Sequence, residues 1–394
     1  MSTKKKITIL GATGSVGQST AHVILSNPDL FDVCTVTANT NVNDLAILAK
    51  KLNAHTAIIA DKTKEEDLKS LLNGSNIRVL SGADEIERAA EEPLDLIMAS
   101  IMGFAGLRPI VKGLEQGTNI AIANKEPLVA AGGYITELAK KNNAKILPVD
   151  SEHNAIFQVF ENDNIKAIDK IILTASGGPF LDWTTEDINN ATPEQAIAHP
   201  NWTMGKKISV DSASMMNKAL EIIEAHYLFN MPAEKIDVVI HPQSVVHSMV
   251  SYTDGSVLSQ MGASDMKTPI AYALGWPKRI DSHGDKLDIK KISELTFSPP
   301  DFNRFPALKY AYQCIEKGQI ACIAFNAANE IAVDMFLNGD IKFSDIIRSV
   351  QYALEVIYPK LPQTPPKTIE DIEKLDNTVR IETIRYLSTN KASA

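Results

Sequence analysis

The stretch Ile9–Gly17, which reads ILGATGSVG, decides the fold of the first part of the chain. It follows the apolar run Ile7–Leu10 and opens an amphipathic stretch, so it predicts a turn between a strand and a helix. Its three glycines permit a tight turn, and the free amides at the start of the helix favour a pyrophosphate. The spacing is G-x-x-G-x-x-G instead of the commoner G-x-G-x-x-G, and a tight turn without a ligand is the alternative. Its position at the first strand-to-helix turn favours a dinucleotide site.

The first 150 residues alternate short apolar runs with amphipathic stretches. Strands separated by helices such as Val42–Leu52 and Lys64–Leu72 indicate a parallel sheet. We therefore predict an α/β fold that begins with a Rossmann-like parallel sheet. The expected strands are Ile7–Leu10, Asp32–Ala38, Ala57–Ala60, Arg78–Leu80, Leu94–Ala99, Asn119–Ile122 and Lys145–Pro148.

The pattern changes after residue 150. Strands are expected at Ile168–Thr174, Val238–Ile240, Val245–Tyr252 and Val257–Met261, and Asp254-Gly255 predicts a hairpin between the last two. Further on, the expected helices are Ala307–Lys317, Ala324–Asn338, Ser344–Ile357 and Ile369–Leu387. We predict a dinucleotide domain at 1–150, an α+β catalytic domain at 151–275, a linker at 276–301 and a C-terminal helical domain at 302–394.

Composition narrows the class of protein. Hydrophobic residues make up 44% and charged residues 22% of the chain, as in soluble globular proteins. A net charge of -9 argues against broad nucleic-acid binding, which needs a basic face. The three cysteines, Cys34, Cys314 and Cys322, lack metal-ligand spacing and suit a reduced, cytoplasmic setting. No apolar run approaches the roughly 18 residues of a membrane span, so we expect no membrane association.

The end of the second expected strand bears on the choice of dinucleotide. An NAD site usually has an acidic residue there, but the chain reads Thr37-Ala38-Asn39-Thr40-Asn41. NADP is therefore favoured over NAD. The segment contains no Arg or Lys that could hold the 2′-phosphate, so this preference rests mainly on the absence of an acidic residue.

The triplet Asp150-Ser151-Glu152 lies where a strand ends and a helix begins. Two carboxylates in such a loop could converge on Mg²⁺ or Mn²⁺, which prefer oxygen ligands. The alternative is a helix cap, with Asp150 or Ser151 capping and Glu152 in the first turn.

The segment 207–221, KISVDSASMMNKALE, strengthens the hypothesis that Asp150 and Glu152 bind a metal ion. A helix over Ser214–Ala225 would put Ser214, Asn217, Lys218 and Glu221 on one face. Ser212, Asn217 and Lys218 could then hold a phosphate, and Glu221 could be a third metal ligand. Glu224 is as plausible as Glu221 on spacing, and a solvated face with a Lys218–Glu221 pair is the alternative.

Three loops also carry candidate groups. Ser176-Gly177-Gly178-Pro179 offers a hydroxyl and open amides to a phosphate, or is a plain turn. The segment 198–205 carries His199, Trp202 and Met204 and could close as a lid, although a lone Trp usually covers a local core. Asn124-Lys125-Glu126 follows a strand at the sheet edge where open α/β folds bind ligands.

Other classes fit less well. A semialdehyde-type dehydrogenase needs a catalytic cysteine, and none of the three is well placed. A short-chain reductase needs a Tyr-x-x-x-Lys pair, which the chain lacks. A nucleotide sensor without turnover would not need the separate group of carboxylates and phosphate donors.

Together these segments closely resemble the 1-deoxy-D-xylulose 5-phosphate reductoisomerase family, over almost the whole chain. The motifs that carry the resemblance are GATGSVGQST (11–20), ANKEPLVAAG (123–132), PVDSEHNAIFQ (148–158), ASGGPF (175–180), HPNWTMGKKISVDSASMMNKALE (199–221), HPQSVVHSMV (241–250) and FNAANEIAV (325–333). The family implies a homodimer formed through the central domain, and a three-part architecture. It implies conversion of 1-deoxy-D-xylulose 5-phosphate to 2-C-methyl-D-erythritol 4-phosphate, with NADPH and a divalent metal (Mg, Mn or Co).

The resemblance also implies residue roles. The metal ligands would be Asp150, Glu152 and Glu221. The substrate contacts would be Ser151, Lys125, Ser176, His199, Ser212, Asn217 and Lys218, under a lid that carries Trp202 and Met204. The NADPH contacts would be Thr13, Gly14, Ser15, Val16, Asn41, Asn124, Glu126 and Gly205. The general base is open between Lys125, His153, a metal-bound water and a substrate hydroxyl.

One departure concerns the loop after the second strand. The family often has a Gly-Lys pair there, and this chain has Ala38-Asn39-Thr40-Asn41. We therefore expect selectivity for NADPH over NADH to be weaker or built differently.

Overall fold

The computed structural model describes residues 4–200, 202 and 204–391 of the 394. The chain forms two compact units, and each takes in several stretches of sequence. Unit 1 comprises Met1–Pro127, Ile135–Asn154 and Asp265–Lys286, and unit 2 comprises Leu128–Tyr134, Ala155–Ser264 and Leu287–Ala394. The four-part division expected from sequence stays a prediction.

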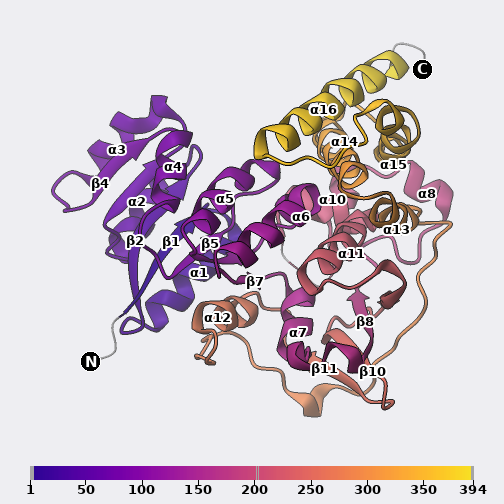
Figure 1. Ribbon diagram of the computed structural model, residues 1–394, viewed down its shortest axis with the longest axis horizontal. Helices are drawn as coiled ribbons and strands as arrows, with labels where there is room; N and C mark the ends of the chain where they lie inside the picture. Colours follow the sequence, from indigo (N-terminus) through magenta and orange to yellow (C-terminus); the bar gives the residue numbers. More distant parts are fainter. Residues whose placement is uncertain (1–3, 201, 203, 392–394) are drawn as a thin grey trace. The chain divides into compact units, whose positions relative to one another are not determined.

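Unit 1 is built on a seven-stranded parallel sheet, which confirms the predicted α/β fold. The strand order is β4-β3-β2-β1-β5-β6-β7, so the order reverses between β1 and β5 (Figure 1). All seven strands lie within two residues of the expected bounds. They are β1 (Lys5–Leu10), β2 (Phe31–Ala38), β3 (Thr56–Ile59), β4 (Arg78–Ser81), β5 (Leu96–Ala99), β6 (Asn119–Ile122) and β7 (Ile146–Pro148).

Helices connect these strands, and the central strands are almost wholly buried apolar runs, as expected for a parallel sheet covered on both faces. The helices are α1 (Ser15–Ser26), α2 (Val42–Lys51), α3 (Glu65–Leu72), α4 (Ala83–Ala90) and α5 (Leu107–Glu115), with α6 (Glu126–Lys141) and α7 (Ser151–Val159) running through both units. A late segment with α12 (Lys267–Gly275) also belongs to unit 1. There the ammonium of Lys5 donates to the carbonyls of Leu274 at 2.7 Å and Trp276 at 3.1 Å.

Unit 2 contains a four-stranded mixed sheet in the order β11-β10-β8-β9. β8 pairs in parallel with β9 and antiparallel with β10, and β10 and β11 form the hairpin that Asp254-Gly255 predicted. The strands are β8 (Ile168–Ala175), β9 (Ile236–Ile240), β10 (Val246–Tyr252) and β11 (Val257–Met261). The helices are α8 (Thr185–Asn189), α9 (Pro193–Ile197), α10 (Lys206–Ala213), α11 (Met216–Phe229), α13 (Ala307–Lys317), α14 (Gln319–Leu337), α15 (Phe343–Tyr352) and α16 (Ile369–Lys391).

The expected helix over Ser214–Ala225 is wrong at its start. α10 ends at Ala213, and α11 begins only at Met216, after Met215 adopts a left-handed φ of 57°. The hydroxyl of Ser214 bonds back to the carbonyls of Val210 and Asp211, so it competes with continuation of the helix. Ser214 therefore does not share a helical face with Asn217, Lys218 and Glu221.

The expectation that no segment could span a membrane also needs correction. By length and composition α14 is apolar enough to do so, with a mean hydropathy of 1.5. However, 72% of the apolar 18-residue stretch of this helix is buried inside the protein. The core helix of a soluble protein can have the same length and hydropathy as a helix that spans a membrane. Cys322 lies on α14 and Cys314 on α13; both are buried, and all three cysteines are free thiols.

The glycine-rich turn depends on Gly17, in the first turn of α1. A Cβ placed there would lie 2.4 Å from the carbonyl oxygen of Gly11 and 2.5 Å from that of Ala12. Only glycine lets the helix begin this close to the backbone of the preceding turn.

We expect Gly17→Ala to lower the free energy of unfolding by at least about 2 kcal/mol, because the added methyl meets backbone that cannot move aside. Helix propensity alone would predict a gain of about 1 kcal/mol. Gly14→Ala is the matched control, since its Cβ meets nothing closer than 3.5 Å, and we expect a loss below about 1 kcal/mol. Urea unfolding of both variants measures the difference, and equal losses would contradict the packing argument.

Candidate active site

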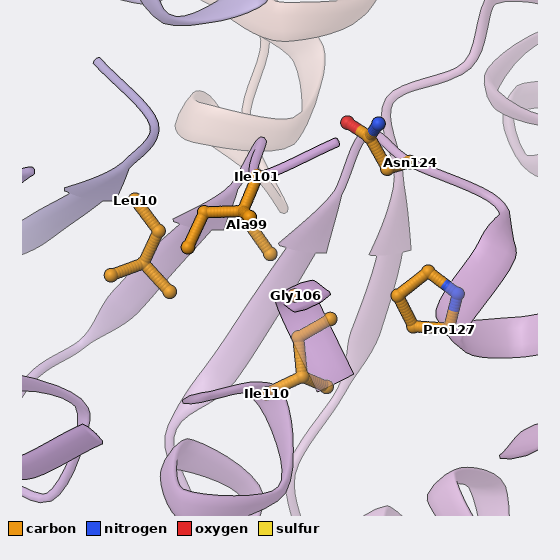
Figure 2. A pocket seen from close by; sticks show the side chains of 7 residues that line it. All are labelled: Leu10, Ala99, Ile101, Gly106, Ile110, Asn124 and Pro127. Carbon is orange, nitrogen blue, oxygen red and sulfur yellow. The ribbon is translucent and has the colours of Figure 1, made fainter. Parts of the chain in front are cut away.

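The carboxyl edge of the parallel sheet forms the first part of the site. A small pocket lies at the ends of β1, β5 and β6, beside the reversal of strand order where open α/β sheets bind ligands. In Figure 2, Asn124 and Pro127 lie across the pocket from Leu10 and Ala99. The complete lining is Leu10, Ala99, Ile101, Gly106, Ile110, Asn124 and Pro127. The pocket thus contains one predicted cofactor contact, Asn124.

The start of α1 has the features of an anion site. Gly14 caps the helix without a side-chain hydrogen bond, and no acidic residue lies in the first turn. The first amides of a helix have no partner within it, so those that follow Gly14 are suited to a pyrophosphate. Thr13 is half-buried and Ser15 is exposed in this turn, as a contact role requires.

Asn41 stabilises the start of α2 in addition to its predicted contact with NADPH. Its side-chain oxygen accepts from the amide of Asp44 at 3.1 Å, and its amide donates to the Asp44 carboxylate at 2.7 Å. The side chain therefore caps α2. Glu126, another predicted cofactor contact, is buried at the start of α6.

The acidic triplet and Lys125 meet at the ends of β6 and β7. The Lys125 ammonium lies 2.7 Å from a carboxylate oxygen of Asp150, and His153 Nδ1 lies 3.8 Å from the same oxygen. Oxygens of Asp150 and Glu152 lie within 4.8 Å of each other, and Ser151 donates its hydroxyl to Glu152 at 2.6 Å. Asp150 also accepts from the amide of Ser151, the first residue of α7, at 3.0 Å.

The charge on Asp150 is strongly stabilised. Burial alone raises the pKa of its carboxyl, but the Lys125 ammonium and the His153 ring outweigh burial and hold this pKa well below its usual range. Asp150 therefore stays ionised, which is the state that binds a cation.

Helix α11 carries the second group of candidates. Glu221 is fully buried; one of its oxygens accepts from the Asn217 amide at 2.5 Å, and the other pairs with the Lys218 ammonium. Glu224, one turn further on, is 1% exposed. Two buried carboxylates on one helix keep both alternatives for the third metal ligand open.

The Ser176 loop and the segment with His199, both predicted to contact the substrate, lie against each other within unit 2. The Trp202 amide donates to Nδ1 of His199 at 3.0 Å, so Nε2 carries the ring proton and donates to Ser176 Oγ at 3.1 Å. The Gly178 amide also donates to this Oγ at 3.2 Å. A Cβ on Gly178, whose φ is +68°, would lie 2.6 Å from the Ser212 carbonyl oxygen, so the loop touches the backbone of Ser212.

The expected lid segment is described in part. Asn201 and Thr203 lie outside the described residues. The Trp202 ring lies 6.1 Å from the ring of His247, while Met204 is half-buried and Gly205 caps α10.

Sequence reasoning missed three residues that organise these loops. His247 is buried on β10 beside Trp202. Arg304 donates to the carbonyls of Phe180, Leu181 and Trp183, directly after the Ser176 loop. Asn329 bonds to Asp211 across 118 residues of sequence. His247 and Asn329 lie within the motifs HPQSVVHSMV and FNAANEIAV, but no local pattern marks Arg304.

The donors fit the expected metal. Asp150, Glu152, Glu221 and Glu224 offer only carboxylate oxygens, and hard cations such as Mg²⁺ and Mn²⁺ prefer such ligands. A Rossmann-like sheet with a turn suited to a pyrophosphate, together with a set of carboxylates, is typical of nucleotide- and metal-dependent oxidoreductases.

Comparisons with known proteins name the family. Three family models match: 1-deoxy-D-xylulose 5-phosphate reductoisomerase at residues 7–132, its C-terminal domain at 146–229, and the DXP reductoisomerase C-terminal domain at 261–382. A 1-deoxy-D-xylulose 5-phosphate reductoisomerase of Zymomonas mobilis is 47% identical over 382 residues, which covers 97% of each chain. This chain belongs to the 1-deoxy-D-xylulose 5-phosphate reductoisomerase family.

Solved structures agree over the full length. The Zymomonas mobilis enzyme in complex with NADPH is similar with a TM-score of 0.91 and 44% identity, covering 98% of this chain and 99% of that one. A reductoisomerase in complex with NADPH, fosmidomycin and magnesium gives a TM-score of 0.94 and 39% identity, with the same coverage. The likeness therefore extends over both units.

We expect Lys125→Met to lower the free energy of unfolding at neutral pH by about 3–5 kcal/mol, because it leaves the Asp150 carboxylate buried without its cation. The folded-state pKa of Asp150 lies below the unfolded value of about 3.9, so the pair stabilises above that pH and loses its contribution as pH falls below it. The difference in the free energy of unfolding between wild type and Lys125→Met should therefore narrow as the pH falls below about 4.

Urea unfolding across this pH range measures the effect. Lys170→Met is the control, because Lys170 pairs with Asp237 at 2.9 Å on the surface and its loss should change stability little. A gap that is independent of pH would refute the role of the Lys125–Asp150 pair.

Proposed function

We infer that this chain is an NADPH-dependent 1-deoxy-D-xylulose 5-phosphate reductoisomerase, an oxidoreductase of isoprenoid precursor biosynthesis. It converts 1-deoxy-D-xylulose 5-phosphate to 2-C-methyl-D-erythritol 4-phosphate by rearrangement and reduction. The full-length likeness to enzymes of this name carries the conclusion. Turnover by the purified chain with this substrate, NADPH and Mg²⁺, followed as NADPH oxidation, tests it.

We propose Asp150, Glu152 and Glu221 as the metal ligands. The support is the ionised state of the half-buried Asp150, its nearby partner Glu152, and the burial of Glu221 beside Asn217 and Lys218 on α11. Glu221 is preferred to Glu224 because Asn217 and Lys218 hold both of its oxygens in a fixed orientation.

The substrate phosphate is proposed to bind Ser176, Ser212, Asn217 and Lys218, with His199 beside it. Ser176 accepts bonds from His199 and Gly178, so its own hydroxyl hydrogen is available to a phosphate oxygen. The Lys218 ammonium and Asn217 amide supply further donors from the first turn of α11.

The cofactor is proposed to lie along the start of α1 and the pocket at the sheet edge. The contacts are Thr13, Gly14, Ser15, Val16, Asn124 and Glu126, together with Asn41 and Gly205. Trp202 and Met204 would cover the bound substrate and exclude water.

The chemistry divides between bound groups and protein residues. A divalent cation would polarise the ketone and hydroxyl oxygens of the substrate, and NADPH would supply the hydride. The Lys125 ammonium lies beside Asp150 and would stabilise negative charge on the substrate oxygens. Ser151 and Glu152 orient one another through their hydrogen bond. His153 is kept as the candidate general base, because its imidazole lies beside Asp150.

The proposed oligomer is a homodimer formed through β11, in the cytoplasm. β11 is the edge strand of the unit 2 sheet, and Val257, Leu258 and Ser259 are exposed on both of its faces. An exposed edge strand with apolar side chains can pair with another chain, and a second copy would cover it.

We expect Glu221→Gln to lower metal-dependent turnover about a hundredfold or more, because a neutral amide is a poor ligand for a hard cation. The Kd for NADPH should stay near the wild-type value, since Glu221 is not among the proposed cofactor contacts. Glu224→Gln is the matched variant from the same buried helix face and should retain far more activity. A larger loss of metal-dependent turnover in Glu224→Gln than in Glu221→Gln would identify Glu224 as the third metal ligand instead.

We expect Leu258→Lys to convert the homodimer to monomer, because it places a charge on the edge that the partner would cover. Light scattering after size-exclusion chromatography measures the mass. Ile47→Lys is the control, since Ile47 is equally apolar and 51% exposed but lies on α2. A dimer that survives Leu258→Lys would rule out β11 as the interface.

A further inference from the structure

The turn between α10 and α11 positions the proposed phosphate donors. Ser212 lies in the last turn of α10, and Asn217 and Lys218 lie in the first turn of α11. Between them Met215 is 2% exposed and has φ 57° and ψ 10°, a left-handed conformation that methionine rarely adopts. Such a conformation persists only where the surrounding structure holds it.

Hydrogen bonds within the turn lead to Asp211. The Ser214 hydroxyl lies 3.1 Å from the carbonyl oxygen of Val210 and 3.2 Å from that of Asp211. The same hydroxyl accepts from the amide of Met216 at 3.3 Å, the first residue of α11. The direction in which α11 starts is therefore tied to the position of Asp211.

The Asp211 side chain is anchored outside the turn. It is 1% exposed; its Oδ2 lies 3.0 Å from the Lys207 ammonium, one turn earlier on α10, and its Oδ1 accepts from the Asn329 amide at 2.8 Å. Lys207 moves with α10, so Asn329 is the contact that ties Asp211 to a different helix, α14. Asn329 is fully buried, and its own Oδ1 has no hydrogen-bond partner among the described residues.

We propose that Asn329 is a positioning residue, whose hydrogen bond to Asp211 holds the α10–α11 turn so that Ser212, Asn217 and Lys218 converge on the substrate phosphate. This inference rests on the proposed function, because only there are these three residues phosphate donors. Asn329 acts through Asp211 and the turn. Its loss should therefore weaken phosphate binding selectively.

The test is Asn329→Leu, which keeps the branched shape and the number of side-chain heavy atoms and removes the amide. We expect the KM for 1-deoxy-D-xylulose 5-phosphate and the inhibition constant of inorganic phosphate both to rise about tenfold, the usual effect of losing a hydrogen bond to a charged group. The Kd for NADPH should stay within about twofold, because none of the proposed cofactor contacts lies on the turn. A folded Asn329→Leu enzyme with unchanged KM and phosphate inhibition would overturn the proposal.

Asn326→Leu is the matched control. Asn326 lies one turn earlier on α14 and is equally buried, and neither of its amide atoms has a hydrogen-bond partner among the described residues. This variant should leave both constants within about twofold of wild type, since it breaks no bond to the turn. An equal rise in both variants would mean that general packing of α14, and not the Asp211 bond, sets phosphate affinity.

Exchange of the two side chains covers the case in which Asn329→Leu does not fold. Asn329→Asp puts two carboxylates together, while the double variant Asp211→Asn with Asn329→Asp restores an amide–carboxylate pair. The double variant should bind inorganic phosphate several-fold more tightly than Asn329→Asp. Absence of rescue would count against the proposal.

The proposed function and the role of Asn329 can be tested independently. A wild-type chain that does not turn over the substrate would refute the proposed function. Phosphorus NMR titration of inorganic phosphate against wild type and Asn329→Leu would still show whether Asn329 controls an anion site.

Discussion

Burial of carboxylates beside lysines is the constraint on which the rest of the site depends. Taking a carboxylate out of water costs several kcal/mol unless a cation and hydrogen bonds compensate. Asp150 meets this requirement through Lys125, and Glu221 meets it through Lys218 and Asn217. Each pair fixes the orientation of a carboxylate, and preorganised carboxylates are what a hard metal ion needs. The same arrangement makes each lysine costly to remove.

The parallel sheet explains why these groups lie where they do in unit 1. All strands of such a sheet end at one edge, so residues far apart in sequence arrive there together. The glycine-rich turn follows β1, Asn124 and Lys125 follow β6, and Asp150 follows β7. The ligand groups can then sit on short loops while the buried strands provide the rigid support.

In the proposed function, unit 2 presents several neutral and cationic donors to one anion, the substrate phosphate. It does so with tight backbone contacts and buried polar pairs. Gly178 lets the Ser176 loop touch the backbone of Ser212, Arg304 holds the carbonyls just after that loop, and Asp211 ties the next turn to α14. A site of this kind is sensitive to residues that never touch the ligand, because small displacements of the donors weaken every bond to the phosphate.

Hydrophobic periodicity, turn residues and long motifs are local signals, and they were sufficient to predict the seven strands of the Rossmann-like sheet, the hairpin at Asp254-Gly255 and the family. Only the tertiary structure decided that the helix before Glu221 breaks at Met215, since a back-bonded Ser214 overrides a continuous helical pattern. It also decided that α14 is a core helix, because length and hydropathy are the same for a buried helix and a membrane span. The Asp211–Asn329 bond joins residues 118 positions apart, and no local pattern carries information across that distance. Burial and long-range pairing depend on which elements meet, and that is settled by packing of the whole chain.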